Sequence, residues 1–578
     1  MQLKILLTLF AFLVTGSIAY ADSYDPETNQ LTIPTISVAG TNYINVVVTV
    51  GNVISTNTGL VETADSYDPA TNVLTIPSIT VAGTTYSNAK LTVGSVLAAT
   101  NGNLSGVFTN RVSGTVVDKS GLPMSGVKIS IFHHNDHVTL TTDTDVGGAF
   151  SFSGLGTWNN SDYAIYAGKT GLGFYPSVGD PAGAVTKFDF NGLYRTVIRF
   201  SSMPAHDVTG ANFTAFRPGD KTASLPRTGQ TTSYASGDDY SVRKGVAWPS
   251  PRFTDNLDGT VSDHLTGLVW LKNAGCFSPT NWSAALTAAN NLASGACGLT
   301  DGSSAGQWRM PNVNELESLV DVSQFNPAVS AGSPFINVSL ANAYWSSTAY
   351  MASFGNSMMA IRFADGRWIN GVDVGDGGFS NIRATSANSL WAVRSGGVGA
   401  VQLLATGVYG GIGGISLGAG DDASLQIGAP LTSPRFIDNG DGTLADTVTG
   451  LTWLKKADCI NQPWSGAITA INSLASGQCG LTDGSSVGQW RMPNRSEMLS
   501  LSDRAPTFPQ AAYLDGQYQA SSAITGPTIF NNFVVSVYYW TSTTDSADTT
   551  RAWTIYSCDF GVYDVAKADS HQYALAVR

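Results

Sequence analysis

A long internal repeat in the C-terminal half of the chain constrains the fold more than any other sequence feature. A Gly-Asp-Asp triplet opens one copy at residues 237–239 and the next at residues 420–422. Both copies contain PRF-x-DN-x-DGT, D-x-x-TGL-x-WLK and GLTDGSS-x-GQWRMPN, and both end in AVR. Self-similarity at a fixed offset indicates repeated structural units. The sequence therefore predicts two equivalent modules, residues 237–396 and 420–578, each with its own tryptophans, helices and cysteine pair and each able to fold alone.

A shorter repeat lies near the N-terminus. DSYDPETNQLTIPTISVAGTNY begins at Asp22, and DSYDPATNVLTIPSITVAGTTY begins at Asp65. Alternating β-branched residues on either side of an Ala-Gly-Thr turn are typical of a β-hairpin. A single hairpin is barely stable in water. Residues 22–105 are therefore predicted to form two hairpin units that stack on each other.

The segment between the two repeats has its own pattern. Residues 110–216 read SGTVVDKSGLPMSGVKI and later TTDTDVGGAFSFSGL, with several short strand-like runs between turns. This pattern resembles the carboxypeptidase regulatory-like domain. The resemblance implies a transthyretin-type or Ig-like β-sandwich that serves as a spacer. Residues 217–236 and the Gly-rich residues 397–419 are interpreted as linkers.

The first 21 residues are typical of an export signal. Lys4 precedes the apolar run 5–14, and Ala-Tyr-Ala at 19–21 is a small-x-small cleavage site. An N-terminal membrane anchor is the alternative, although the apolar run is short for a bilayer span. We therefore expect an extracellular or cell-surface protein, with the periplasm as the other location, and no transmembrane segment in the mature chain.

Composition narrows the function. Only 12% of the residues are charged, 62 are glycine, and the net charge is −12. Nucleic-acid binding depends on lysine and arginine neutralising phosphates, so the acidic balance argues against it. The 578-residue length predicts several domains. The expected fold class is a multidomain, mainly β protein with α+β modules at the C-terminus.

The cysteines indicate disulfides. Cys276 and Cys297 are 21 residues apart, and Cys459 and Cys479 are 20 apart, in equivalent places of the two modules. Equal spacing in an exported chain predicts the disulfides Cys276–Cys297 and Cys459–Cys479. Close C-x-x-C pairs, which zinc sites need, are absent. Cys558 is left over and is predicted to be a free thiol.

Other shared residues have structural explanations. Apolar residues at helical spacing follow Trp282 and Trp464, and predict one amphipathic helix inside each cysteine pair. Asn-x-x-Glu at 312–315 and 494–497 predicts a capping box at the start of a second helix. The shared tryptophans are predicted to be core residues, with a sugar-stacking platform as the alternative. They are Trp270, Trp282, Trp308 and Trp345 in the first module and Trp453, Trp464, Trp490 and Trp540 in the second.

The module motifs, above all GLTDGSS-x-GQWRMPN, resemble the C-terminal domain family of the Lcl collagen-like adhesin. The resemblance implies a C-type-lectin-like fold, binding of glycan or host polymer, and assembly into trimers. The Glu-Pro-Asn and Trp-Asn-Asp motifs of calcium-dependent lectins are missing, since the nearest triplets are Met-Pro-Asn at 310–312 and 492–494. Formylglycine-generating enzymes have a related fold, but their reactive cysteine pair is not matched here.

One metal site is considered. The DN-x-DG loops at 255–259 and 438–442 place oxygen ligands at alternating positions, as Ca²⁺ prefers. The candidate ligands are Asp255, Asp258, Asp263, Asp438, Asp441 and Asp446. No bidentate glutamate follows, and the same pattern is also that of a plain hairpin turn. Asp263 and Asp446 would then cap the TGL turn.

Ligand contacts are expected in the stretches where the two modules differ, because variable loops on a common scaffold usually carry specificity. The candidates are Tyr350, Arg362, Arg367, Trp368, Tyr513 and Tyr518. The alternative is that the aromatic and methionine side chains of these stretches, including Met358, Met359 and Phe533, only fill the core.

These patterns predict an adhesin or binding protein whose partner is glycan, extracellular polymer or protein. A structural envelope or matrix protein that self-assembles through its modules is the alternative. No nucleophile and base recur together in both modules, so we expect no enzyme activity. Module one has 9 basic against 12 acidic residues and module two has 9 against 15, so only weak heparin binding is expected.

Overall fold

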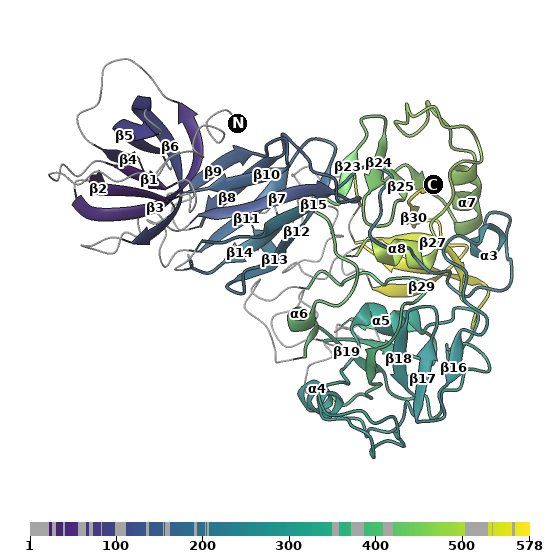
Figure 1. Cartoon of the computed structure of the whole chain (residues 1–578). Coiled ribbons are helices and arrows are strands. Elements are labelled where there is room, and N and C mark those ends of the chain that lie inside the picture. The colour runs from purple at the N-terminus through teal and green to yellow at the C-terminus, as the bar shows by residue number, and fades with distance from the viewer. Residues whose placement is uncertain are drawn as a thin grey trace. The chain divides into compact units, whose positions relative to one another are not determined.

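The computed structural model shows two compact units (Figure 1). The first comprises residues 1–168, 176–185 and 197–214, and the second comprises 169–175, 186–196 and 215–578. The predicted signal peptide, Tyr350, Tyr513, Tyr518 and Cys558 lie outside the described residues. The structure describes residues 22–25, 30–38, 41–55, 65–68, 73–81, 84–98, 111–134, 138–153, 155, 162–189, 194–202, 204, 207–349, 358–370, 386–408, 420–502, 530–534, 536–557 and 561–578.

The N-terminal repeats form one six-stranded sheet in the order β1-β2-β3-β6-β5-β4. Each repeat contributes an antiparallel hairpin, β2 with β3 and β5 with β6, and the two hairpins pair through β3 and β6. This confirms the predicted hairpins, which pair edge to edge in one sheet and do not stack on each other as expected. Buried residues such as Leu31, Ile33, Leu74 and Ile76 alternate along the strands and form one apolar core. The strands are β1 (Ser23–Asp25), β2 (Gln30–Val38), β3 (Thr41–Ser55), β4 (Ser66–Asp68), β5 (Val73–Val81) and β6 (Thr84–Ala98).

The middle segment contains nine strands in two sheets, with orders β10-β7-β15-β12 and β13-β14-β11-β8-β9. Alternating burial along β10, at Phe150 and Phe152, is what a half-buried strand requires. The strands are β7 (Val112–Asp118), β8 (Lys128–His133), β9 (Val138–Asp143), β10 (Ala149–Phe152), β11 (Tyr163–Gly168), β12 (Gly173–Val178), β13 (Gly183–Asp189), β14 (Tyr194–Phe200) and β15 (Ala211–Phe216).

The two C-terminal modules share two helices and two sets of three strands, β16–β18 with β23–β25 and β19–β21 with β27–β29, and differ in the further strands β22, β26 and β30. The chain as described is a mainly β, multidomain protein. Module one has the sheets β16-β17-β18-β22 and β19-β20-β21, and module two has β23-β24-β25 and β26-β30-β27-β28-β29. Module one consists of β16 (Phe253–Asp255), β17 (Thr260–Asp263), β18 (Leu268–Leu271), α4 (Trp282–Asn290), α5 (Val313–Ser318), β19 (Tyr344–Ala349), β20 (Met358–Arg362), β21 (Arg367–Asn370) and β22 (Val393–Ser395). Module two consists of β23 (Phe436–Asp438), β24 (Thr443–Asp446), β25 (Thr452–Leu454), β26 (Ile460–Asn461), α7 (Trp464–Asn472), α8 (Arg495–Ser500), β27 (Tyr538–Thr544), β28 (Arg551–Tyr556), β29 (Val562–Ala566) and β30 (Tyr573–Ala574).

The predicted helices and core are confirmed. α4 and α7 begin at Trp282 and Trp464, and α5 and α8 begin with complete capping boxes. All eight shared tryptophans are buried in the core rather than presented to a ligand. One apolar cluster runs through both modules and includes Trp270 and Trp391 as well as Trp453 and Trp553. The modules are therefore not separate globules with a polar boundary.

The two predicted linkers need a correction. Ala223 and Thr228 lie in residues 217–236, and Leu404 and Thr406 lie in residues 397–419, yet all four are buried. Both segments contain short apolar and threonine side chains between glycines, which suffices for packing against a neighbouring surface. Only residues 409–419 of the second segment lie outside the described part of the chain.

Both predicted disulfides are present, Cys276–Cys297 and Cys459–Cys479. Each joins the chain before an amphipathic helix to the chain after it, and so holds α4 or α7 in its module. Within the described residues, no helix is both long and apolar enough to cross a membrane.

Replacing Cys276 and Cys297 together by alanine is expected to lower the free energy of unfolding by about 3 kcal/mol, because the disulfide no longer restricts the unfolded chain. The matched pair Cys459 and Cys479 closes a loop of nearly equal length and should cost the same. Urea unfolding measures both changes. Peptide mapping without reductant checks the pairing, and a peptide linking Cys558 to any of the four would contradict it.

Candidate functional site

The segment before each module packs on the other module. We define arm 1 as residues 224–246 and arm 2 as residues 402–408 and 420–429, the described residues before module two. Each arm is a loop closed by a parallel bridge between its ends, Pro226 with Val246 in arm 1 and Leu404 with Ala429 in arm 2. Each carries a one-turn helix, α3 (Asp239–Val242) or α6 (Asp422–Leu425). Arm 1 contacts module two, and arm 2 contacts module one.

The repeated Gly-Asp-Asp triplet explains how an arm binds. Gly237 has a φ of +88°, and a side chain there would collide with Asn472 at the end of α7. Asp238 is the N-cap of α3 and accepts a hydrogen bond from the backbone N–H of Ser241 at 2.9 Å. Asp239 is buried. The first residue thus permits close approach, the second starts the short helix, and the third enters module two.

Asp239 is held by a relay of hydrogen bonds. Its Oδ2 accepts from the hydroxyl of Thr228 within arm 1 at 2.6 Å and from the hydroxyl of Thr543 in module two at 2.7 Å. The Thr543 hydroxyl oxygen in turn accepts from the backbone N–H of Arg495 in the first turn of α8 at 3.0 Å. The Asn494 side chain caps α8 and also donates to the carbonyl of Lys244 at 3.3 Å.

Arm 2 repeats these contacts on module one. Asp422 Oδ2 accepts from Thr406 at 2.6 Å and from Thr348 at 2.7 Å. The Thr348 hydroxyl oxygen accepts from the backbone N–H of Val313 in α5 at 3.0 Å. Asn312, which caps α5, donates to the carbonyl of Ile427 at 3.1 Å. The two arms are therefore exchanged reciprocally between two equivalent docking sites.

The exchange accounts for three motifs that the modules share: Gly-Asp-Asp, Trp-[Ser/Thr]-Ser-Thr and Met-Pro-Asn. The threonine that ends the second and the asparagine that ends the third meet the triplet in space. Sequence reasoning predicted the capping role of Asn312 and Asn494 but missed the arms. The available signal was the triplet itself, repeated outside any predicted strand or helix.

Burial controls the charge state of the two aspartates. It raises the pKa of Asp239 to about 6, against the opposing hydrogen bonds from Thr228 and Thr543, while Glu497 and Asp238 add to the rise. It raises the pKa of Asp422 to about 7 against Thr406 and Thr348, while Glu315 raises the pKa and Arg309 lowers it. A carboxyl that is easier to protonate when folded stabilises the folded state most at low pH.

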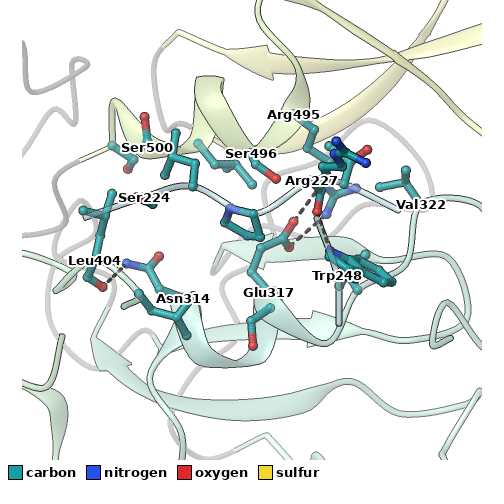
Figure 2. Close-up of a pocket in the computed structure, with 18 of the residues that line it drawn as sticks. Ser224, Arg227, Trp248, Asn314, Glu317, Val322, Leu404, Arg495, Ser496 and Ser500 are labelled. Atoms are coloured by element: carbon teal, nitrogen blue, oxygen red, sulfur yellow. Dashed lines mark hydrogen bonds and ion pairs between the residues drawn. The ribbon is translucent and has the colours of Figure 1, made fainter. Parts of the chain in front are cut away.

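A single ion pair crosses between the helices α5 and α8. Arg495 donates to both carboxylate oxygens of Glu317 at 3.0 Å, and its guanidinium stacks on Trp553. The Arg495 side chain is 1% exposed. When the two modules are aligned on their Met-Pro-Asn motifs, Arg495 corresponds to Val313 and Glu317 to Leu499. The equivalent pair, Val313 and Leu499, is apolar and forms no ion pair. The Arg495–Glu317 pair lies beside a cavity that arm 1, arm 2, α5 and α8 enclose (Figure 2).

The aspartates predicted as calcium ligands bond lysine, arginine, threonine and backbone groups of the protein. Asp255 and Asp438 accept from the ammonium groups of Lys272 and Lys455, at 2.6 and 2.5 Å, and these contacts lower the pKa of both carboxyls. Asp258 and Asp441 accept hydrogen bonds from the backbone N–H and the hydroxyl of Thr260 and Thr443.

Asp263 and Asp446 are buried against Arg252 and Arg435 and cap the TGL turns. No group of three His, Cys, Asp or Glu side chains among the described residues could hold a metal. The contacts of the six aspartates are those that the hairpin turns and the TGL turns require, and the Ca²⁺ site stays a prediction.

Of the predicted binding residues, the structure describes Arg362, Arg367 and Trp368, which lie on the hairpin of β20 and β21. Arg362 and Arg367 both contact Asp365, and Arg367 also pairs with Asp564 of module two. Trp368 is buried, donates to Glu317 and lines the cavity. Met358, Met359 and Phe533 are buried, as the core-filling alternative holds. Tyr350, Tyr513 and Tyr518 lie outside the described residues.

The C-terminal half of the chain thus consists of two α+β modules of one kind, joined by exchanged arms. Residues 259–394 and 442–578 each match the family model of the Lcl C-terminal domain, so the chain carries two tandem copies of that domain. Each arm lies just before one of the matched ranges and outside it. No curated protein matches the chain.

Replacing Asp239 and Asp422 together by asparagine should flatten the pH dependence of stability. Both carboxyls have a folded pKa above the usual value near 3.8. At these two positions the folded wild type therefore binds more protons than the unfolded chain between about pH 4 and 7, and the stability that the two groups contribute falls as pH rises through that window. Urea unfolding at several pH values measures the slope. An equal slope in the double variant would contradict this role.

Replacing Arg495 by valine, its counterpart in module one, should lower the free energy of unfolding by about 3 kcal/mol, because Glu317 is left without its cation. Glu317→Leu alone leaves Arg495 unpaired and should also destabilise. The double variant restores the apolar pair found on the other side and should recover most of the loss. A double-mutant cycle in urea measures the coupling, and additive losses would count against this pairing.

Proposed function

We propose that the chain is an exported adhesin or binding protein whose two lectin-like modules act together as one unit that binds a glycan or extracellular polymer. The observation that carries the proposal is that the charged side chains shared by the two modules already bond other groups of the protein, at turns, helix ends and arms. These side chains are therefore not available for catalysis. The acidic outer surface of the modules is then the part that recognises a ligand.

The arginines of the modules favour a ligand other than a polyanion. Every arginine that the structure describes between residues 252 and 578 faces a carboxylate within ion-pair distance. Neutralised guanidinium groups do not produce the positive field that steers a sulfated polymer. The pairs are Arg252–Asp263, Arg309–Glu315, Arg362–Asp365, Arg367–Asp564, Arg394–Asp301, Arg435–Asp446, Arg491–Glu497, Arg495–Glu317, Arg551–Asp564 and Arg578–Asp483.

The same contacts support a non-enzymatic role. Glu315 and Glu497 are the best-placed acids of the repeated motifs, but each accepts from a backbone N–H at its helix start and from both terminal nitrogens of an arginine. A carboxylate held in this way has both oxygens occupied by hydrogen-bond donors. It has no capacity left to accept a proton from a substrate.

A structural protein that assembles through its modules is the second candidate. The exchanged arms favour it, because each docking site accepts an arm that belongs to another copy of the same module. Exchange of identical elements is a known route from monomer to oligomer. Light scattering on the full chain distinguishes the two candidates, since a binding protein of this design is complete as a monomer.

The proposed function predicts that the full-length chain binds members of a glycan array but elutes from heparin below about 0.5 M salt, where the Debye length is under roughly 5 Å. Asp365→Asn is the matched variant, because it removes the acid that Arg362 and Arg367 share. It should elute at higher salt than the wild type. Retention of the wild type beyond that concentration would indicate a polyanion ligand, and an array without any bound glycan would contradict glycan recognition.

A further inference from the structure

The cavity between the modules has a lining suited to a ligand. Its volume is about 70 Å³, room for roughly five water molecules at about 10–15 Å³ each. Figure 2 shows Glu317 and Asn314 rising from one module, Arg495 and Ser496 facing them from the other, and the arm segment with Ser224 and Arg227 between them. Apolar walls with a few convergent polar groups are typical of small-molecule sites.

The three charged lining residues have apolar counterparts at the equivalent positions of the other copy. Arg227 in arm 1 corresponds to Ala405 in arm 2, since both precede the threonine that bonds the buried aspartate. Arg495 and Glu317 likewise stand where the other copy has valine and leucine. The arm and the helix therefore fold equally well with small apolar residues at these places. The shared fold does not require charged side chains at these three positions.

Two of these charged groups have donors left over. Among the described residues, Nη1 of Arg495 and Nε of Arg227 are buried and make no hydrogen bond. Arg227 has no acidic partner in the described part of the chain, while its carbonyl accepts from the indole of Trp248 at 2.8 Å. Glu317 is engaged by Arg495 and by the indole of Trp368. The cavity thus has one positive charge in excess, and buried donors of this kind are costly without an acceptor.

We propose that this cavity binds the carboxylate end of a sugar acid. A carboxylate supplies the charge and the acceptor oxygens that a guanidinium group prefers. The side chains of Ser224, Ser496 and Gln402 line the same space and can bond ring hydroxyls. A space of this size suits a single sugar unit, and the carboxylate is the group of that unit that the guanidinium groups favour. This inference rests on the proposed glycan binding and names its chemistry.

Calorimetric titration of the full-length chain with glucuronate tests the inference. One site per chain is expected. Glucose, which lacks the carboxylate, and acetate, which lacks the ring, should each bind at least about tenfold more weakly. Arg227→Ala copies Ala405 and keeps the carbonyl that Trp248 uses, so it should fold and weaken glucuronate binding at least about tenfold. Arg227→Gln, which keeps the length without the charge, should do the same.

Arg243→Gln is the matched control. It removes a charge from the exposed end of the same arm, and Gln426 is its natural counterpart, with a φ of 48° against 51° for Arg243. It should leave binding unchanged. Equal binding of acetate, equal binding of glucose, or wild-type affinity in either Arg227 variant would overturn the inference. If Arg227→Ala leaves glycan-array binding intact, the proposed function survives without this site, whereas an array with no hits removes both.

Discussion

The C-terminal half depends on a buried carboxylate that lies between a threonine of its own arm and a threonine of the opposite module. The module threonine also accepts from the first turn of a helix, so the carboxylate is joined to the positive end of that helix through one hydroxyl. This arrangement occurs twice with distances that agree within 0.1 Å. It holds the arms, and the arms hold the modules on a shared core. The cavity between α5 and α8 exists because the arms close it.

Local patterns in the sequence were sufficient to predict the helices, strands and disulfides, but not which of them pack against one another. Spacing of three and four residues identified α4 and α7, and Asn-x-x-Glu identified the starts of α5 and α8, because helix periodicity and capping involve neighbours in sequence. Equal cysteine spacing identified both disulfides. The N-terminal hairpins followed from strand alternation around a turn.

The arms could not be predicted in this way. Thr543 lies 304 residues from Asp239, and nothing local distinguishes an arm that folds back on its own module from one that crosses to the other. The cavity was missed for the same reason, since Arg227, Glu317 and Arg495 come from three distant segments and Arg227 lies in a stretch that reads as a linker. Among the candidate residues that the structure describes, Trp368 is the one that lines the cavity.

Duplication of a module usually suggests duplication of its binding sites. Here the reciprocal arms bring both copies around one space, and the charged residues of that space come from unequal positions of the two halves. The two modules therefore enclose this cavity jointly, and a ligand bound there would occupy one site per chain rather than one per module. Multivalent attachment, and the avidity that comes with it, would have to arise from the number of chains on a surface and not from the number of repeats in a chain.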